Sequence, residues 1–206
     1  VGPDMAEVRA KRTAQLAEAM KNLPQFSGTI EEKAIPGLNG APDVPVRVYQ
    51  QDDVLFPDAV MVWLHGGGYV LGSSDDPPVF RFTHLCQAVS VEYRMAPEHR
   101  CPAGVEDACA AIEWVAANAA ELGIDPKKIT IGGPSGGGGL AAGAALLKRD
   151  RGGPELLYQF LIYPMIDDTH NTPSGHMDLP PYVWTREVSL RAWSMYVEEE
   201  GPSYYA

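Results

Sequence analysis

The stretch that decides the fold is "ITIGGPSGGGGLAAGAALL", residues 129–147. It opens with a short apolar run that favours a strand, passes through glycines, and ends in an Ala- and Leu-rich segment that favours a helix. Ser135 stands at the centre of the Gly-x-Ser-x-Gly pattern formed by residues 133–137. We therefore expect a sharp turn between strand and helix that exposes the Ser135 hydroxyl at the carboxyl edge of a sheet.

Further short apolar runs without alternation predict strands buried on both faces of a parallel sheet. They lie at 59–65, 88–93, 128–133 and 156–164. Residues 28–35 and 44–50 predict edge strands. Because strands alternate with helical segments, we expect an α/β fold with a doubly wound, mostly parallel sheet flanked by helices.

Helical spacing of apolar residues predicts two further helices. Residues 5–23 form a modest stripe that consists of Met5, Val8, Leu16, Met20 and Leu23. Residues 105–122 place Val105, Cys109, Ile112, Val115, Ala119 and Leu122 on one face and Glu106, Asp107, Glu113 and Glu121 on the other. We expect the first face to be buried and the acidic face to point to solvent.

Composition excludes several function classes. The 206 residues carry a net charge of −11, which repels nucleic acid and anionic membranes. No apolar run is long enough to span a bilayer, and no signal peptide is visible, so we expect a cytoplasmic protein. The cysteines, Cys86, Cys101 and Cys109, lack paired spacing for a zinc site, so we expect reduced thiols and no metal.

A second glycine cluster follows the apolar run at 59–65. It reads "HGGGY", residues 65–69, and such a cluster after a strand is typical of a loop whose bare N–H groups approach a substrate. We expect the N–H groups of Gly67 and Gly68, together with that of Gly136, to converge on the oxygen of a carbonyl attacked by Ser135. The predicted catalytic residue is Ser135, and the predicted oxyanion hole is Gly67, Gly68 and Gly136.

Four blocks in order resemble the hormone-sensitive lipase family of α/β-hydrolases. They are "HGGGY", "VEYRMAPEHRCPAGVEDACAAIEWV", "GGPSGGGGLAAG" and "LIYPMIDD". The resemblance implies a serine carboxylesterase or lipase without a cofactor, acting on a small-molecule ester of short to medium acyl chain. It also implies an N-terminal cap helix at 1–25 on a hydrolase core at 26–206, and leaves the oligomeric state open.

The resemblance also assigns roles to other residues. His65 is expected to stabilise the glycine loop rather than act as the catalytic base. Tyr93, Arg94, Pro97 and Glu98 are expected to fix the loop after their strand. Two positions depart from the family pattern, since Pro134 stands where Asp is usual and Gly139 where Asn is usual.

The catalytic acid and histidine of the family do not follow Ser135 in recognisable surroundings. One interpretation is that the C-terminal strands carrying them are missing from this chain. A second is a local substitute formed by Asp167 or Asp168 with His170 or His176. A third is a member of the fold that binds a small molecule without turning it over.

An unrelated interpretation is nucleotide binding through the glycines at 132–139. Gly137, Gly139 and Ala142 imitate a dinucleotide fingerprint, but a phosphate loop of the Walker type needs Gly-Lys-Ser/Thr, and Leu140 and Ala141 stand there instead. Nucleotide binding would also leave the "HGGG" cluster unexplained, so ester hydrolysis is the preferred prediction.

Overall fold

The computed structural model describes residues 5–21, 26–75, 79, 82–177 and 184–197. The described strands form one sheet in the order β1-β2-β4-β3-β5-β6. They are β1 (Thr29–Ile35), β2 (Val44–Gln50), β3 (Val60–Leu64), β4 (Gln87–Val91), β5 (Ile129–Pro134) and β6 (Tyr158–Ile162). The helices are α1 (Met5–Met20), α2 (Ala103–Ala117), α3 (Ala119–Leu122), α4 (Gly136–Arg151) and α5 (Arg186–Tyr196).

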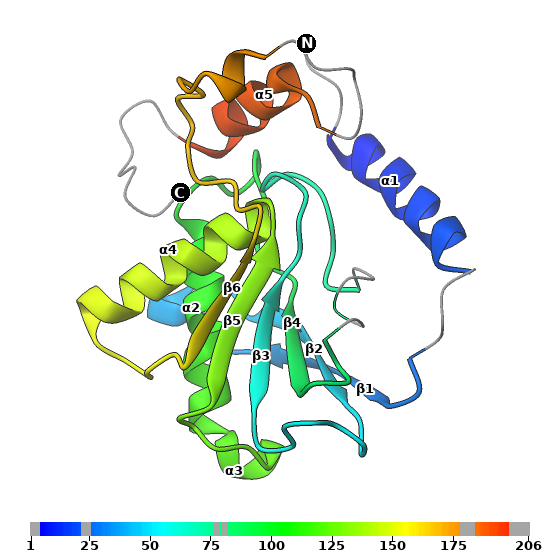
Figure 1. Ribbon diagram of the computed structural model, residues 1–206, viewed down its shortest axis with the longest axis vertical. Helices are drawn as coiled ribbons and strands as arrows, with labels where there is room; N and C mark the ends of the chain where they lie inside the picture. Colours follow the sequence, from blue (N-terminus) through cyan, green and yellow to red (C-terminus); the bar gives the residue numbers. More distant parts are fainter. Residues whose placement is uncertain (1–4, 22–25, 76–78, 80–81, 178–183, 198–206) are drawn as a thin grey trace.

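The sheet is mixed, with its parallel part in the centre. β4, β3, β5 and β6 run parallel, whereas β1 and β2 are antiparallel to their neighbours. α2 and α4 pack against each other and against the sheet, which places both on the same face (Figure 1). Every residue of β3 is buried, as expected for a central strand covered on both faces. The predicted α/β architecture is therefore confirmed.

Two predicted elements differ from the structure in their position or extent, and one observed helix has no predicted counterpart. β1 is an edge strand as predicted, but β2 lies between β1 and β4. The helix predicted over 105–122 is divided at Asn118, whose φ of −104° and ψ of 17° end α2 and whose side-chain amide donates to the carbonyl of Trp114 (2.8 Å). No prediction was made for α5, whose first turn is capped by the Thr185 hydroxyl.

The prediction that residues 156–164 form a strand buried on both faces is wrong. β6 pairs with β5 and has no second neighbour among the described strands. Its side chains are exposed or half-buried, with Tyr158 at 61% and Leu161 at 37% exposure. An apolar run without alternation therefore identified the strand correctly but not its position at the edge.

The prediction that Asp107 points to solvent is also wrong. Its side chain is 1% exposed and accepts hydrogen bonds from the backbone N–H of Arg94 (2.8 Å) and from the Arg94 guanidinium (2.7 Å to Oδ1). The predicted apolar face of this segment is buried throughout, from Val105 to Leu122. A carboxylate can be buried beside that face because Arg94 supplies both charge and directed donors.

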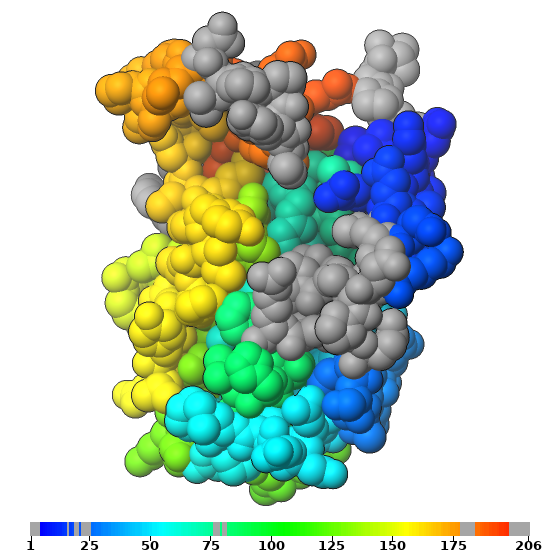
Figure 2. Space-filling view, turned by 45° about the vertical axis from the view of Figure 1, so that its right-hand side comes forward, coloured from blue at the N-terminus to red at the C-terminus, as the bar shows by residue number. Residues whose placement is uncertain are grey.

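Two helices lie at the end of the sheet where the parallel strands finish, and both approach the segment after β3 (Figure 1). α5 packs there through Ala192, Trp193 and Tyr196. α1 lies on the other flank, with Met5 packed against the core. The stripe residues Leu16, Met20 and Leu23 lie outside the described side chains. Figure 2 shows the turquoise surface of the segment after β3 between blue α1 and the yellow and orange segment after β6.

The pair between the buried Asp107 and the partly buried Arg94 yields a stability prediction. Asp107→Ala should lower the free energy of unfolding in urea by about 3 kcal/mol, because it leaves the Arg94 guanidinium without its carboxylate. The matched control is Glu106→Ala, which removes a surface pair with Arg151 and should cost about 0–1 kcal/mol. Equal, small losses in the two variants would contradict a structural role for Asp107.

Candidate active site

Ser135 occupies a strained turn between β5 and α4. Its φ of 54° and ψ of −120° place a non-glycine residue in a sparsely populated backbone region. The backbone N–H of Ser135 donates to the carbonyl of Ile162 (2.9 Å), and its carbonyl accepts from Gly139 (3.0 Å) and Met165 (2.9 Å). The turn is thus held by hydrogen bonds from α4 and from the end of β6.

The Ser135 side chain is free for chemistry. Although Ser135 is the N-cap residue of α4, its hydroxyl makes no capping hydrogen bond. The residue is half-buried, whereas Pro134 and Gly136 on either side are buried. The first N–H groups of α4 have no partner within the helix, and its N-terminal end favours negative charge. A serine hydroxyl without a capping bond and a helix end that favours an anion therefore adjoin each other.

Two glycines of the turn are required by the close approach of α4 to the end of β3. A Cβ atom at Gly133 or Gly137 would overlap the carbonyl oxygen of Leu64, and one at Gly137 would also lie 2.5 Å from that of His65. Only glycine permits this contact, which brings the Ser135 turn beside the "HGGGY" loop.

The loop that follows β3 brings two backbone nitrogens close to the Ser135 turn. The carbonyl of Gly67 accepts from the N–H groups of Val70 (3.2 Å) and Leu71 (3.0 Å). In a trans peptide the C=O and N–H point in opposite directions, so the Gly68 N–H points away from Val70 and Leu71. A Cβ at Gly136 would lie 3.0 Å from Gly68 N and 2.9 Å from Tyr69 N, which places these nitrogens beside the start of α4.

Of the predicted oxyanion residues, the structure brings Gly68 and Gly136 together. Gly67 shapes the turn, with a φ of 126° and a Cβ position already filled by the carbonyl of Leu71. Gly68 has a φ of 59°, and its Cβ position is filled by the indole of Trp184, a residue that the sequence analysis did not identify. Trp184 is 36% exposed, so this ring borders the loop from the solvent side.

His65 is buried and holds the loop from inside. Its Nδ1–H donates to the carbonyl of Gly66 (2.9 Å), and its ring stacks on Tyr93 with centroids 4.2 Å apart. The Tyr93 hydroxyl donates to the carbonyl of His65 (2.8 Å). Burial lowers the pKa of His65, which favours the neutral ring. These contacts agree with the predicted loop-stabilising role.

Tyr69, the last residue of the "HGGGY" stretch, explains the departure at Gly139. Its hydroxyl donates to the carbonyl of Met165 and occupies the space that a Cβ at Gly139 would need. The ring of Tyr69 stacks on Tyr196 of α5, with centroids 3.9 Å apart and an interplanar angle of 11°. Glycine at 139 thus makes room for a hydrogen bond that links the loop to the segment after β6.

The structure does not bring the alternative local acid and base to Ser135. Within the described residues, no hydrogen bond joins Ser135 Oγ to a histidine. His170 Nε2 lies 2.7 Å from Ser189 Oγ instead, and His176 is exposed. The Asp167 carboxylate accepts from the Thr169 N–H (3.0 Å) and hydroxyl (2.6 Å), which lowers its pKa. Asp168 is exposed, so this segment has the character of a solvated loop.

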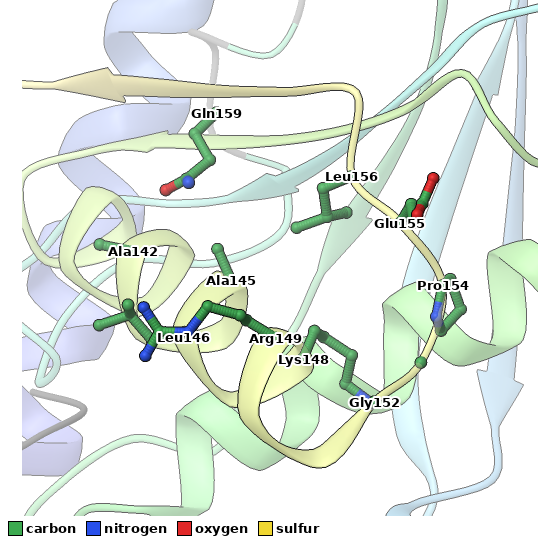
Figure 3. Close-up of a pocket in the computed structure, with 11 residues that line it drawn as sticks. Ala142, Ala145, Leu146, Lys148, Arg149, Gly152, Pro154, Glu155, Leu156 and Gln159 are labelled. Atoms are coloured by element: carbon green, nitrogen blue, oxygen red, sulfur yellow. The ribbon is translucent and has the colours of Figure 1, made fainter.

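A hollow of about 700 Å³ lies away from this site, between α4 and the segment that leads into β6 (Figure 3). Its walls include Ala142, Ala145 and Leu146 of α4 and Gln159 of β6. None of the lining residues belongs to the Ser135 turn or to the glycine loop, so the hollow is not the candidate active site. Among the described residues, no helix is both long and apolar enough to cross a bilayer.

Known proteins resemble this chain over most of its length. A family model described as "alpha/beta hydrolase fold" matches residues 61–205. Carboxylesterase NlhH of Mycobacterium tuberculosis is 46% identical over 196 residues, which cover 92% of this chain and 60% of that protein. Carboxylic ester hydrolase LipN of the same organism is 37% identical over 190 residues, 84% of this chain and 47% of that protein.

Solved structures agree with these relatives. A bacterial heroin esterase superposes with a TM-score of 0.87 at 37% identity, covering 96% of this chain and 63% of its own. A hyperthermophilic esterase from the archaeon Pyrobaculum calidifontis superposes with a TM-score of 0.77 at 34% identity, covering 96% and 64%. The chain thus spans between 47% and 64% of the length of these relatives. By its matched segments and its fold, the chain belongs to the α/β-hydrolase family.

Proposed function

We propose that this protein is a serine carboxylesterase that forms an acyl-enzyme on Ser135. The observation that carries the proposal is the position of Ser135. Its hydroxyl makes no capping bond at a backbone turn with a φ of 54°, and this turn adjoins Gly136, whose Cβ position lies 3.0 Å from Gly68 N. The relatives named carboxylesterase and carboxylic ester hydrolase support the same reaction class.

In the proposed reaction, Ser135 Oγ attacks the carbonyl carbon of an ester. The carbonyl oxygen becomes negative and accepts hydrogen bonds from the N–H groups of Gly68 and Gly136, with the Gly67 N–H as a third donor. The N-terminal end of α4 adds a favourable field for this charge. Collapse of the tetrahedral intermediate expels the alcohol and leaves the acyl group on Ser135, and water then releases the acid.

A base must accept the Ser135 proton during attack and return a proton to the leaving alcohol. Among the described residues none makes a hydrogen bond to Oγ, and His65 is buried with its Nδ1–H already engaged. In this proposal the described residues supply the nucleophile and the anion donors. None of them contacts Ser135 Oγ in a way that would let it act as the base. Histidine is the residue type expected in that role.

The proposed substrate is a small-molecule ester with a short to medium acyl chain. The indole of Trp184 fills the space next to Gly68 and so limits the room beside the proposed oxyanion hole. We also propose a cytoplasmic location. Cys86, Cys101 and Cys109 are all unpaired, which suits a reducing compartment.

The proposed nucleophile is tested on this chain by supplying the base from solution. With p-nitrophenyl acetate as substrate, added imidazole should raise hydrolysis by the parent chain well above hydrolysis by Ser135→Ala at the same imidazole concentration. The expectation follows because imidazole can accept the proton of Ser135 Oγ and so activate it as a nucleophile, whereas alanine offers no group to activate. The measurement is the initial rate of p-nitrophenolate release.

Two control variants make this result specific. Ser194→Ala, which alters an exposed serine of α5, should behave like the parent chain. Hydrolysis without imidazole that disappears in His170→Ala would establish the local base instead. Identical rates for the parent chain and Ser135→Ala at every imidazole concentration would rule out Ser135 as the nucleophile.

The oxyanion loop is tested by two alanine substitutions at comparable backbone angles. Gly68 has a φ of 59° beside Trp184, whereas Gly123 has a φ of 68° and nothing within 4 Å of its Cβ position. Both variants should lose about 1–2 kcal/mol of stability from the left-handed backbone. Gly68→Ala should in addition lower kcat of the imidazole-assisted reaction by roughly 10²–10³-fold through loop displacement, with KM changing much less.

The stability and the kinetics are measured on the same preparations. Gly123→Ala should keep the parent kcat at a temperature where it remains folded. If Gly68→Ala also kept the parent kcat, Gly68 would be needed only for the backbone conformation of the loop. The oxyanion assignment of this loop would then be refuted.

A further inference from the structure

One cap-helix side chain makes four hydrogen bonds to the two segments that border the proposed oxyanion loop. Arg9 of α1 donates from Nε to the carbonyl of Val70 (2.8 Å) and from Nη2 to the carbonyl of Ala96 (2.6 Å). Its two terminal nitrogens donate to the two carboxylate oxygens of Glu98, at 2.9 and 2.8 Å. The Arg9 side chain is 22% exposed, so these bonds are partly shielded from water.

The two carbonyls that Arg9 reaches belong to one hydrogen-bonded network. The N–H of Ala96 donates to the carbonyl of Tyr69 (2.9 Å), which is the residue before Val70. The N–H of Val70 donates in turn to the carbonyl of Gly67 (3.2 Å). Since that carbonyl fixes the direction in which the Gly68 N–H points, Arg9 is connected through Val70 to the proposed oxyanion donor.

We propose that Arg9 is a positioning residue for ester hydrolysis, which holds the Gly68 N–H in place through Val70 and Ala96. The inference rests on the proposed function, because the Gly68 N–H affects the rate of hydrolysis only if it donates to the oxyanion of the reaction. The guanidinium suits this task, since its planar fork binds a carboxylate with two nitrogens while Nε and Nη2 also reach the two carbonyls. A lysine could not make these contacts simultaneously.

The ion pair with Glu98 gives the guanidinium its orientation. The hydrogen bonds from Arg9 lower the pKa of Glu98, so the carboxylate stays charged. Glu98 is 49% exposed, and a pair so exposed contributes little stability by itself. The bonds to Val70 and Ala96 are the ones that should affect the loop.

The test compares Arg9→Ala and Arg9→Lys with Arg12→Ala, which alters an exposed arginine of the same helix. Hydrogen exchange should accelerate by on the order of tenfold at the amides of Val70 and Leu71 in both Arg9 variants, as expected for the loss of one or two hydrogen bonds. Exchange at these amides should be unchanged in Arg12→Ala. Acceleration confined to α1 would overturn the proposal, because Arg9 would then only anchor the helix.

Kinetics on the same variants separate positioning from a structural role. In the imidazole-assisted hydrolysis of p-nitrophenyl acetate, Arg9→Ala should lower kcat by roughly tenfold while KM changes by less than about threefold. Glu98→Ala, which leaves both carbonyl bonds in place, should have a smaller effect on kcat and on exchange. If Arg9→Ala and Glu98→Ala changed kcat and exchange equally, or if Arg9→Ala left kcat unchanged, the proposed positioning role of Arg9 would be overturned.

The proposed function can fail separately from this inference. If hydrolysis by the parent chain did not depend on Ser135, the proposed function would be refuted. The exchange rates at Val70 and Leu71 would still decide whether Arg9 fixes the loop.

Discussion

The arrangement of the candidate site depends on one close contact, in which the start of α4 meets the end of β3. No Cβ can be accommodated at Gly133 or Gly137, because the carbonyl oxygen of Leu64 already fills the position. This contact sets the distance between two loops that are about 70 residues apart in the sequence. It places Ser135, the first N–H groups of α4, which have no partner within that helix, and the loop that follows His65 side by side.

The glycine loop itself is flexible by composition, and its surroundings supply the rigidity that it lacks. Tyr69 stacks on Tyr196 from one side and hydrogen-bonds to the carbonyl of Met165. Arg9 approaches from the other side through Val70. Because these contacts come from α5, from the segment after β6 and from α1, the orientation of the Gly68 N–H depends on parts of the chain that are distant in sequence. These contacts would preorganise the proposed oxyanion donor, and preorganised donors stabilise developing charge at little cost at the moment of reaction.

The sequence predicted what local pattern determines. The strand, turn and helix around Ser135 and the apolar face from Val105 to Leu122 follow from spacing and residue type. Pairings between distant residues could not be predicted in this way. Asp107 looks like a surface residue until Arg94 is placed beside it. Likewise, Gly139 is explained only by the hydroxyl of Tyr69, and the edge position of β6 depends on which strands are its neighbours.

The central claim is that an oxygen bound at Ser135 meets the N–H groups of Gly68 and Gly136. The most direct measurement is a crystal structure of this chain with phenylboronic acid, whose boron forms a tetrahedral adduct with a serine oxygen. The account predicts a bond from boron to Ser135 Oγ, with one boronate oxygen about 2.7–3.1 Å from both Gly68 N and Gly136 N. An adduct on Ser135 whose oxygens all point away from these two nitrogens, or an adduct on another residue, would contradict it.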